Sequence, residues 1–207
     1  MIQPDGRHIR AFLAISLPDP VKQVLGKIQN RLRDRGIAAT WTRPETLHLT
    51  LKFLGNIPFQ DLELFKAAMI QAADQVSPFE LSVGGLGVFP GIGKARVVWA
   101  GTGGCTDILE NLFKALELSL GPLGIEKETR RFSAHITLGR IKKPVPGPVW
   151  IDLIQACQDI RSPLFKVQCL DLYKSELRAS SALHTRLFQA RFAKGNIDDK
   201  FAELSPG

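Results

Sequence analysis

Hydrophobic positions along the chain form two kinds of pattern, the short apolar runs of strands and the three-to-four-residue spacing of helices. In the first half they predict strands over 10–17, 47–54 and 79–88 and helices over 20–36 and 60–75. In the second half they predict strands over 96–100, 134–141, 165–176 and 184–192 and helices over 108–120 and 149–159. Both halves read strand, helix, strand, helix, strand, which indicates an internal repeat of topology.

This repeated order predicts an α+β fold with two lobes. A β-α-β-α-β arrangement is duplicated, with one copy in each lobe, and together the lobes form two facing, mainly antiparallel sheets with helices on their outer faces. We expect one domain over residues 1–207, with pseudo-symmetric lobes over roughly 9–90 and 95–192 and with exchange of strands between the lobes left open. Two facing sheets leave a central cleft, which is a natural place for a ligand.

The composition is that of a globular protein that can bury its own core. Of 207 residues, 44% are hydrophobic and 23% are charged, and the formal net charge of +7 favours partners that carry phosphate groups. No apolar stretch is long enough to predict a membrane span, and residues 1–8 lack the apolar run of a secretory signal. The three cysteines fit neither a disulfide framework nor a zinc site, so we expect a cytoplasmic protein.

The middle strand of each half carries the motif His-x-Thr-Leu. It occurs as His48-Leu49-Thr50-Leu51 and again, 87 positions later, as His135-Ile136-Thr137-Leu138. Because strand side chains alternate between faces, each motif presents an imidazole and a hydroxyl side by side, backed by apolar side chains. The same alternation predicts that Phe53 lies on the apolar face and that Arg140 lies on the face opposite the second histidine. We expect the two polar pairs to line one cleft.

These side chains suit the cleavage of a phosphodiester. Histidine titrates near neutral pH, so one imidazole can take a proton from the nucleophile while the other protonates the leaving oxygen. The threonine hydroxyls can donate hydrogen bonds to the non-bridging oxygens, where charge builds up. A half-buried histidine bonded to backbone would explain one motif, but two copies on equivalent strands are harder to explain in that way. Two histidines without a carboxylate cluster make a poor metal site, so we expect no metal and no other cofactor.

Beyond the two motifs, the chain resembles the two-histidine (2H) phosphoesterase superfamily, and within it the RNA 2′,3′-cyclic phosphodiesterases, formerly called 2′-5′ RNA ligases. The resemblance covers most of the chain and is carried by 10–18 (RAFLAISLP), Trp41, 47–55 (LHLTLKFLG), 87–90 (GVFP), 96–99 (RVVW), 131–140 (RFSAHITLGR) and 175–177 (SEL). The chain departs from the family just before the second motif, where prolines are common in a form like RPFxPH and this chain has 131–135 (RFSAH). It also departs at His184, where an aromatic is common.

The resemblance implies hydrolysis of a terminal 2′,3′-cyclic phosphate of RNA to a 2′-phosphate, without a metal. It makes His48 the general acid that protonates the 3′ oxygen and His135 the base that activates water, with the direction of the two roles left open. Thr50 and Thr137 would bind the phosphate. The implied partners are RNA ends that carry the cyclic phosphate, tRNA halves among them, and the implied side reaction is reversible 2′-5′ joining of RNA.

Four other side chains are of interest beside the motifs. Arg131 can clamp a phosphate with its guanidinium, with a surface ion pair as the alternative. Trp41 and Phe89 can stack on a terminal base, although core packing explains at least one of them as well. For His184 we expect a structural or exposed position rather than a catalytic one.

Two other functions remain open at this point. The same site suits small cyclic phosphates or 2′-5′ oligonucleotides, and the length and charge of the cleft mouth distinguish these substrates from RNA. A non-catalytic RNA-binding module on the same scaffold is the other alternative, although binding alone requires neither an acid nor a base. The chain has no long heptad pattern, which argues against a coiled-coil assembly. We expect a monomer.

Overall fold

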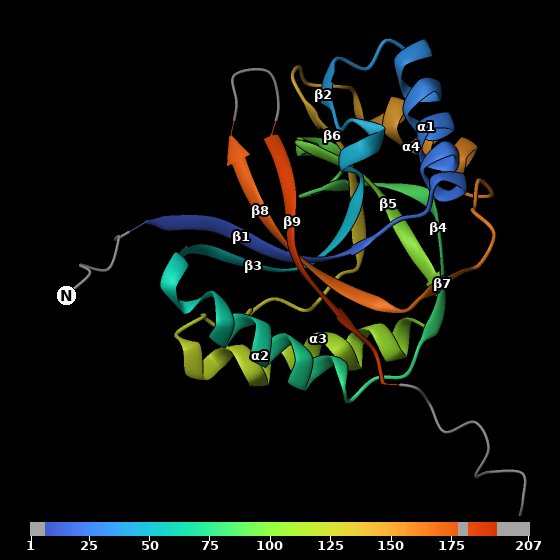
Figure 1. Cartoon of the computed structure of the whole chain (residues 1–207). Coiled ribbons are helices and arrows are strands. Elements are labelled where there is room, and N and C mark those ends of the chain that lie inside the picture. Colours follow the sequence, from blue (N-terminus) through green and yellow to red (C-terminus); the bar gives the residue numbers. More distant parts are fainter. Residues whose placement is uncertain (1–6, 178–181, 194–207) are drawn as a thin grey trace, which may run out of the picture.

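The computed structural model describes residues 7–177 and 182–193 of the chain (Figure 1). Its strands are β1 (His8–Ser16), β2 (Ala39–Trp41), β3 (His48–Pro58), β4 (Phe79–Phe89), β5 (Val97–Gly104), β6 (His135–Ile141), β7 (Phe165–Val167), β8 (Cys169–Leu177) and β9 (Ala182–Arg191). Its α-helices are α1 (Asp19–Asp34), α2 (Leu62–Ala73), α3 (Thr106–Leu120) and α4 (Gly147–Cys157). Short 3-10 turns are η1 (Pro44–Thr46), η2 (Phe59–Asp61), η3 (Ile92–Lys94) and η4 (Gly121–Leu123).

The strands form two sheets, here called sheet A and sheet B. Sheet A has the order β3-β1-β8-β9, and sheet B has the order β2-β6-β5-β4-β7. Neighbouring strands pair antiparallel throughout both sheets, and each sheet takes strands from both halves of the sequence. With the helices on their outer faces, the sheets confirm the predicted α+β class.

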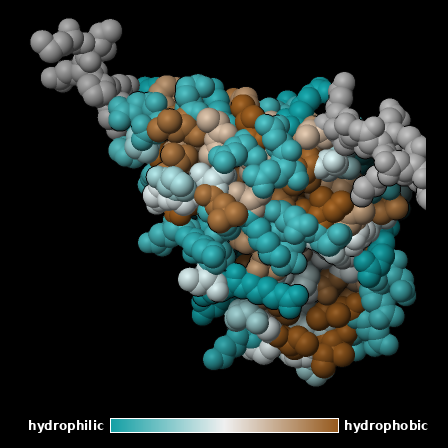
Figure 2. Space-filling model, turned by 90° about the horizontal axis from the view of Figure 1, so that it is seen from below, coloured by the Kyte–Doolittle hydropathy of each residue, from teal (hydrophilic) through white to brown (hydrophobic). Residues whose placement is uncertain are grey.

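The helices cover the sheets in two pairs (Figure 1). Helices α2 and α3 lie side by side, with α2 packed against β8 and β9 and α3 against β3 in sheet A. Helices α1 and α4 pack against β4 in sheet B. The face of the molecule that contains α2 and α3 is mostly hydrophilic, with scattered hydrophobic areas (Figure 2). No helix in the described ranges is long and apolar enough to cross a membrane.

Helix α1 illustrates how the sequence pattern positions the cleft. Its apolar face recurs at helical spacing and is almost completely buried through Val21, Leu25, Ile28 and Leu32. Gln29 is buried on the same helix, and its Nε2 donates to the carbonyl oxygens of Thr42 at 2.8 Å and of Leu138 at 2.9 Å. A buried amide needs such partners. The helix is therefore fixed to β6, the strand that carries the second motif.

The apolar side of both motif strands is deeply buried. Leu49 and Ile136 stand between the histidine and the threonine of each motif and have no exposed surface. Leu51 and Leu138 are buried as well. Fully burying an aliphatic side chain of this size stabilises a fold by about 1.5–3 kcal/mol. The burial of these apolar neighbours therefore keeps the histidine and threonine side chains of both motifs on the cleft side of their strands.

Two features of the sheets differ from the predicted elements. Strand β2 has three residues, which are too few to show a period, and the hydrophobic pattern does not predict it. The single strand predicted over 165–176 is wrong because the chain changes sheets within it. Val167 pairs with Phe79 in sheet B, whereas Cys169 pairs with Arg191 in sheet A.

Candidate active site

Both motif histidines begin their strands, and the same kind of backbone contact holds each ring. Nδ1 of His48 lies 2.7 Å from the carbonyl oxygen of Thr46, and Nδ1 of His135 lies 2.7 Å from the carbonyl oxygen of Ser133. A carbonyl oxygen can only accept, so we assign the hydrogen to Nδ1 in both rings. Nε2 of each neutral ring is therefore the nitrogen that can take up a proton in the cleft.

A β-bulge follows the threonine of each motif. In sheet A the pairing of β3 with β1 skips Leu51, and in sheet B the pairing of β6 with β5 skips Leu138. The extra residue reverses the alternation of faces beyond it. Phe53 and Arg140 therefore turn to the side of the motif histidines and line the cleft. Their predicted placement on the opposite faces is wrong, because it assumes an unbroken alternation.

The cleft consists of two adjoining hollows that meet at the motif threonines. The larger hollow, of about 1240 Å³, is lined by His135, and the smaller, of about 400 Å³, is lined by His48. Thr50, Thr137 and Arg140 line both hollows. The two imidazoles therefore flank a shared floor that carries two hydroxyls and a guanidinium.

The His48 ring is enclosed by aromatic side chains. The Phe12 ring stacks on it with centroids 4.8 Å apart, and the His184 ring meets it edge-on at 5.4 Å. Burial lowers the pKa of His48 from 6.5 to about 4, although the hydrogen bond to Thr46 opposes the shift, and a positive charge on His184 lowers the pKa further. In the free protein at neutral pH, His48 is therefore an uncharged imidazole.

The His135 ring stands against a different aromatic pair. The Phe89 ring meets it edge-on, with centroids 5.0 Å apart, and the Trp99 ring lies at 6.1 Å. Phe89 and Trp99 stack on each other at 5.0 Å. Gly87 leaves room for this stack, because a Cβ at that position would lie 2.2 Å from the Trp99 ring. The aromatic pair therefore forms a wall beside the second histidine.

The remaining side chains singled out from the sequence are divided between the hollows. Arg131 and Phe89 line the larger one, and Trp41 lines the smaller one. The guanidinium of Arg33 lies 5.1 Å from the centre of the Trp41 ring, so this ring already has a cationic partner. His184 also lines the smaller hollow and lies against His48, although the sequence gives it only a structural or exposed position.

Basic side chains gather along both hollows. The larger is lined by Lys52, Arg96, Lys127, Arg130, Arg131 and Arg140, and the smaller by Arg10, Arg43 and Arg140. The acidic residues of the larger hollow are Glu126 and Glu128. This excess of positive charge suits a ligand with more than one phosphate group.

Taken together, the cleft contains the groups for proton transfer at a phosphate. Two imidazole nitrogens can exchange protons on either side of the shared floor, and hydroxyl and guanidinium donors can bind the oxygens of a phosphate between them. Among residues 7–177 and 182–193, no group of three or more His, Cys, Asp or Glu side chains is arranged to hold a metal ion.

Comparison with known sequences gives consistent matches. The sequence model of a family described as "LigT like Phosphoesterase" matches residues 15–99 and 102–183, and these ranges include both motifs. An RNA 2′,3′-cyclic phosphodiesterase of Thermotoga maritima is 32% identical over 191 residues, which cover 91% of this chain and 98% of the relative. Another, from Methanothermobacter thermautotrophicus, is 30% identical over 177 residues, which cover 86% of this chain and 95% of the relative.

Solved structures share the same architecture. TT0787 of Thermus thermophilus superposes with a TM-score of 0.74 at 28% identity and covers 90% of this chain and 100% of its own. LigT of E. coli in its apo form has a TM-score of 0.70 at 23% identity, with 90% and 99% covered, and this likeness concerns the fold. The resemblance seen in the sequence is confirmed, and the chain belongs to the family of LigT-like phosphoesterases.

Proposed function

We propose that this protein hydrolyses the terminal 2′,3′-cyclic phosphate of RNA to a 2′-phosphate by acid-base catalysis between His48 and His135, without a metal. The observation that carries the proposal is the position of two imidazoles, each with Nδ1 bound to a backbone carbonyl, on either side of a floor shared by Thr50 and Thr137. Relatives named RNA 2′,3′-cyclic phosphodiesterase, matched over most of the chain, support this substrate.

In this proposal His135 is the general base. Its Nε2 takes a proton from a water molecule while the water oxygen attacks phosphorus on the side opposite the 3′ oxygen. The ring then carries a positive charge, and the hydrogen bond from Nδ1 to the carbonyl oxygen of Ser133 stabilises that charge. The larger hollow on this side of the floor leaves room for the water.

His48 is the general acid of the proposal. Burial holds the pKa of His48 at about 4 in the free protein, so the ring is uncharged at neutral pH. It must therefore take up a proton when the substrate binds. The negative charge of a phosphodiester bound at the floor favours the protonated imidazole and raises the pKa. Nε2 then donates that proton to the 3′ oxygen as the bond between this oxygen and phosphorus breaks. The products are a 2′-phosphate and a 3′-hydroxyl.

Thr50, Thr137 and Arg140 stabilise the transition state in this scheme. The hydroxyl hydrogens of the two threonines point to the non-bridging oxygens, where negative charge increases during attack. The guanidinium of Arg140 is available from both hollows and adds a charge-assisted contact to the same phosphate. These contacts hold the phosphorus between the two imidazoles.

The RNA strand that leads to the cyclic phosphate follows the basic side of the cleft in our proposal. Cations that line the larger hollow, Lys127, Arg130 and Arg131, are suited to neutralise backbone phosphates of RNA ends, including those of tRNA halves. Joining of RNA ends through a 2′-5′ linkage is the same chemistry with a 5′-hydroxyl in place of water. We propose it as a side reaction that uses the same two histidines.

The test is product identification in EDTA, with an RNA oligonucleotide that ends in a 2′,3′-cyclic phosphate. We expect complete conversion to a terminal 2′-phosphate, seen by resistance to a 3′-specific phosphatase and by mass spectrometry. A 3′-phosphate product, or a requirement for added metal, would contradict the proposed chemistry. Turnover of cyclic mononucleotides but not of the oligonucleotide would make the substrate a small molecule. Tight binding without turnover would make the protein an RNA-binding module.

A further inference from the structure

A buried ion pair joins the first motif strand to the helix that precedes the second motif. Nζ of Lys52 on β3 lies 2.6 Å from Oε1 of Glu117 on α3, and the two side chains are 9% and 6% exposed. Removing two charges from water is costly, so such a pair requires further contacts to compensate. The proposed acid-base chemistry assigns no role to either residue.

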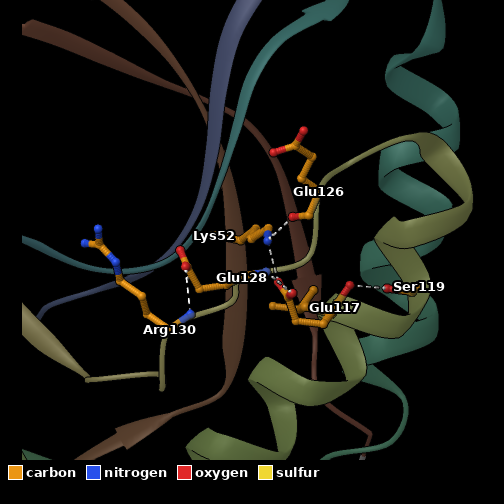
Figure 3. Close-up of polar contacts among 7 residues, drawn as sticks. Lys52, Glu117, Ser119, Glu126, Glu128 and Arg130 are labelled. Carbon is orange, nitrogen blue, oxygen red and sulfur yellow. Dashed lines mark hydrogen bonds and ion pairs between the residues drawn. The ribbon is translucent and has the colours of Figure 1, made fainter.

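The further contacts go to the backbone of one irregular segment, residues 124–131, which we call the basic segment. Nζ of Lys52 donates to the carbonyl oxygen of Glu126 at 2.7 Å, and the backbone N–H of Glu128 donates to Oε2 of Glu117 at 2.7 Å (Figure 3). The basic segment contains no helix or strand. The ion pair therefore supplies backbone hydrogen bonds that regular structure would otherwise supply.

The basic segment forms a side of the larger hollow and carries Lys127, Arg130 and Arg131 into its lining. The backbone N–H of Arg130 donates to Oε1 of Glu128 at 3.1 Å, which extends the anchored part of the chain by two residues. The guanidinium of Arg130 points away from the ion pair (Figure 3). The pair therefore holds the backbone from which these cations project without neutralising them itself.

A second, apolar anchor lies between the basic segment and the second histidine. The Phe132 ring stacks on the Phe113 ring of α3, with centroids 4.3 Å apart and planes at 13°. Ser133, the next residue, supplies the carbonyl oxygen that holds His135. The polar anchor therefore acts on the cations, and the apolar anchor acts on the histidine.

We propose that Lys52 and Glu117 are positioning residues that fix the basic segment as a binding surface for the RNA backbone. This inference rests on the proposed function. It explains how the site would favour RNA over small cyclic phosphates. A cyclic mononucleotide fills only the floor and the two histidines. An oligonucleotide also reaches the basic segment, where anchored cations bind phosphates without first losing the freedom of a loose loop.

The test compares the wild type with the double variant Lys52→Met/Glu117→Leu, which removes both charges and leaves neither one buried alone. With an RNA oligonucleotide ending in a 2′,3′-cyclic phosphate, we expect KM to rise about tenfold, the size of one lost charge-assisted contact. The dependence of log KM on log salt concentration should become shallower, because fewer phosphates are neutralised. With a 2′,3′-cyclic mononucleotide, kcat and KM should stay close to the wild-type values.

The matched control is Glu110→Leu/Lys114→Met, which makes the same chemical change at an exposed ion pair of α3. In that pair Nζ of Lys114 lies 3.2 Å from Oε1 of Glu110. The control should leave kcat and KM unchanged for both substrates. Equal losses on both substrates, or unchanged KM for the oligonucleotide, would overturn the proposal. If the double variant does not fold, Glu117→Gln is tested instead, because its amide oxygen keeps an acceptor for the backbone N–H of Glu128. We expect this variant to raise KM less than the double variant does, and only for the oligonucleotide. An equal effect on both substrates would overturn the proposal.

Amide hydrogen exchange separates this proposal from the proposed function, because it needs no substrate. Amides of residues 125–131 should exchange faster in the double variant than in the wild type, while those of β3 and β6 should not change. Unchanged exchange in the basic segment would overturn the anchoring role. An inactive wild type with faster exchange in the variant would contradict the proposed function and leave the anchor established.

Discussion

At the scale of single residues, the backbone contact of each motif histidine determines which ring nitrogen is free to take up a proton in the cleft. His48 and His135 each bond through Nδ1 to the carbonyl oxygen two residues earlier, at the point where the chain enters its strand. The motif itself places an imidazole beside a hydroxyl, and this much is readable from the alternation of a strand. The tautomer is not readable, because it depends on a carbonyl whose direction is set by the turn before the strand.

His48 should make the folded protein sensitive to acid. Its pKa is about 4 in the folded state against 6.5 in the unfolded chain, so as pH falls from 6.5 to about 4 the unfolded state gains a proton that the folded state does not. We expect a loss of stability on the order of 3 kcal/mol over this window. Urea unfolding at several pH values should show a shallower dependence for His48→Gln, and an unchanged dependence would contradict the burial argument.

A bound phosphate should reverse the pKa shift of the same residue. The negative charge near Thr50 and Arg140 favours the imidazolium, so the pKa of His48 should rise from about 4 when a nucleoside 2′-phosphate binds. NMR titration of the ring protons with and without the nucleotide measures this directly. No rise on saturation with the nucleotide would place the phosphate away from His48.

At the scale of elements, the two bulges decide which side chains join the site. Leu51 and Leu138 have the apolar character of ordinary inward positions, so their own side chains do not mark them as the extra residues. Gly139 is the one readable sign, since a glycine inside a strand often accompanies a bulge or a close approach. A Cβ there would lie 2.9 Å from the Trp41 ring. Without the bulges, Phe53 and Arg140 are predicted on the wrong faces.

The other elements follow closely from the hydrophobic period. Each predicted α-helix, and each predicted strand other than 165–176, is present near its predicted position, because the apolar spacing of these elements is a strong signal. The crossing between sheets at Gln168 could not be predicted, because Val167 and Cys169 are both unremarkable strand residues. The path of 165–176 depends instead on tertiary pairing, because its first residues pair with β4 in sheet B and its later residues pair with β1 and β9 in sheet A.

The close packing of β4 on β5 gives a prediction for Gly87. A Cβ in Gly87→Ala would lie 2.2 Å from the Trp99 ring, which stands beside His135. We expect a loss of about 1–3 kcal/mol in the free energy of unfolding and slower hydrolysis of the cyclic phosphate.

Gly93→Ala is the matched control for this change, because a Cβ on Gly93 has no atom within 4 Å. Chemical denaturation and initial rates measure both effects. Equal behaviour of the two variants would mean that the Trp99 stack does not position His135.

At the scale of the whole molecule, the cleft exists only where the two sheets meet. Sheet A combines β1 and β3 with β8 and β9, and sheet B combines β2 and β4 with β5, β6 and β7. Each sheet therefore needs strands from both halves of the sequence. The lobes over 9–90 and 95–192 remain a proposal about internal symmetry, and the pairing makes them depend on each other for folding.

This dependence predicts that neither half folds alone. A fragment of residues 1–94 lacks β8 beside β1 and lacks β5 and β7 beside β4, which leaves unpaired sheet edges. We expect fragments 1–94 and 95–207 to show no cooperative thermal unfolding by circular dichroism, and the full chain to unfold in a single transition. Cooperative unfolding of either fragment would mean that a lobe is an independent folding unit.

The central claim is that two imidazoles act as acid and base on opposite sides of one phosphate, and single-turnover rates test it most directly. Wild type, His48→Ala and His135→Ala are compared on an RNA 2′,3′-cyclic phosphate and on its analogue with sulfur in place of the 3′ oxygen. A thiolate leaves without needing a proton, so the analogue does not require the acid. The measurement therefore separates the two roles as well as detecting them.

We predict that each variant loses about a thousandfold in rate on the oxygen substrate, the usual size of a general acid or base contribution. On the sulfur analogue, His48→Ala should recover most of the wild-type rate, while His135→Ala should not. If His135→Ala instead recovered most of the wild-type rate on the sulfur analogue, His135 would be the general acid and His48 the general base. Wild-type rates for either variant on the oxygen substrate would contradict the two-histidine mechanism itself.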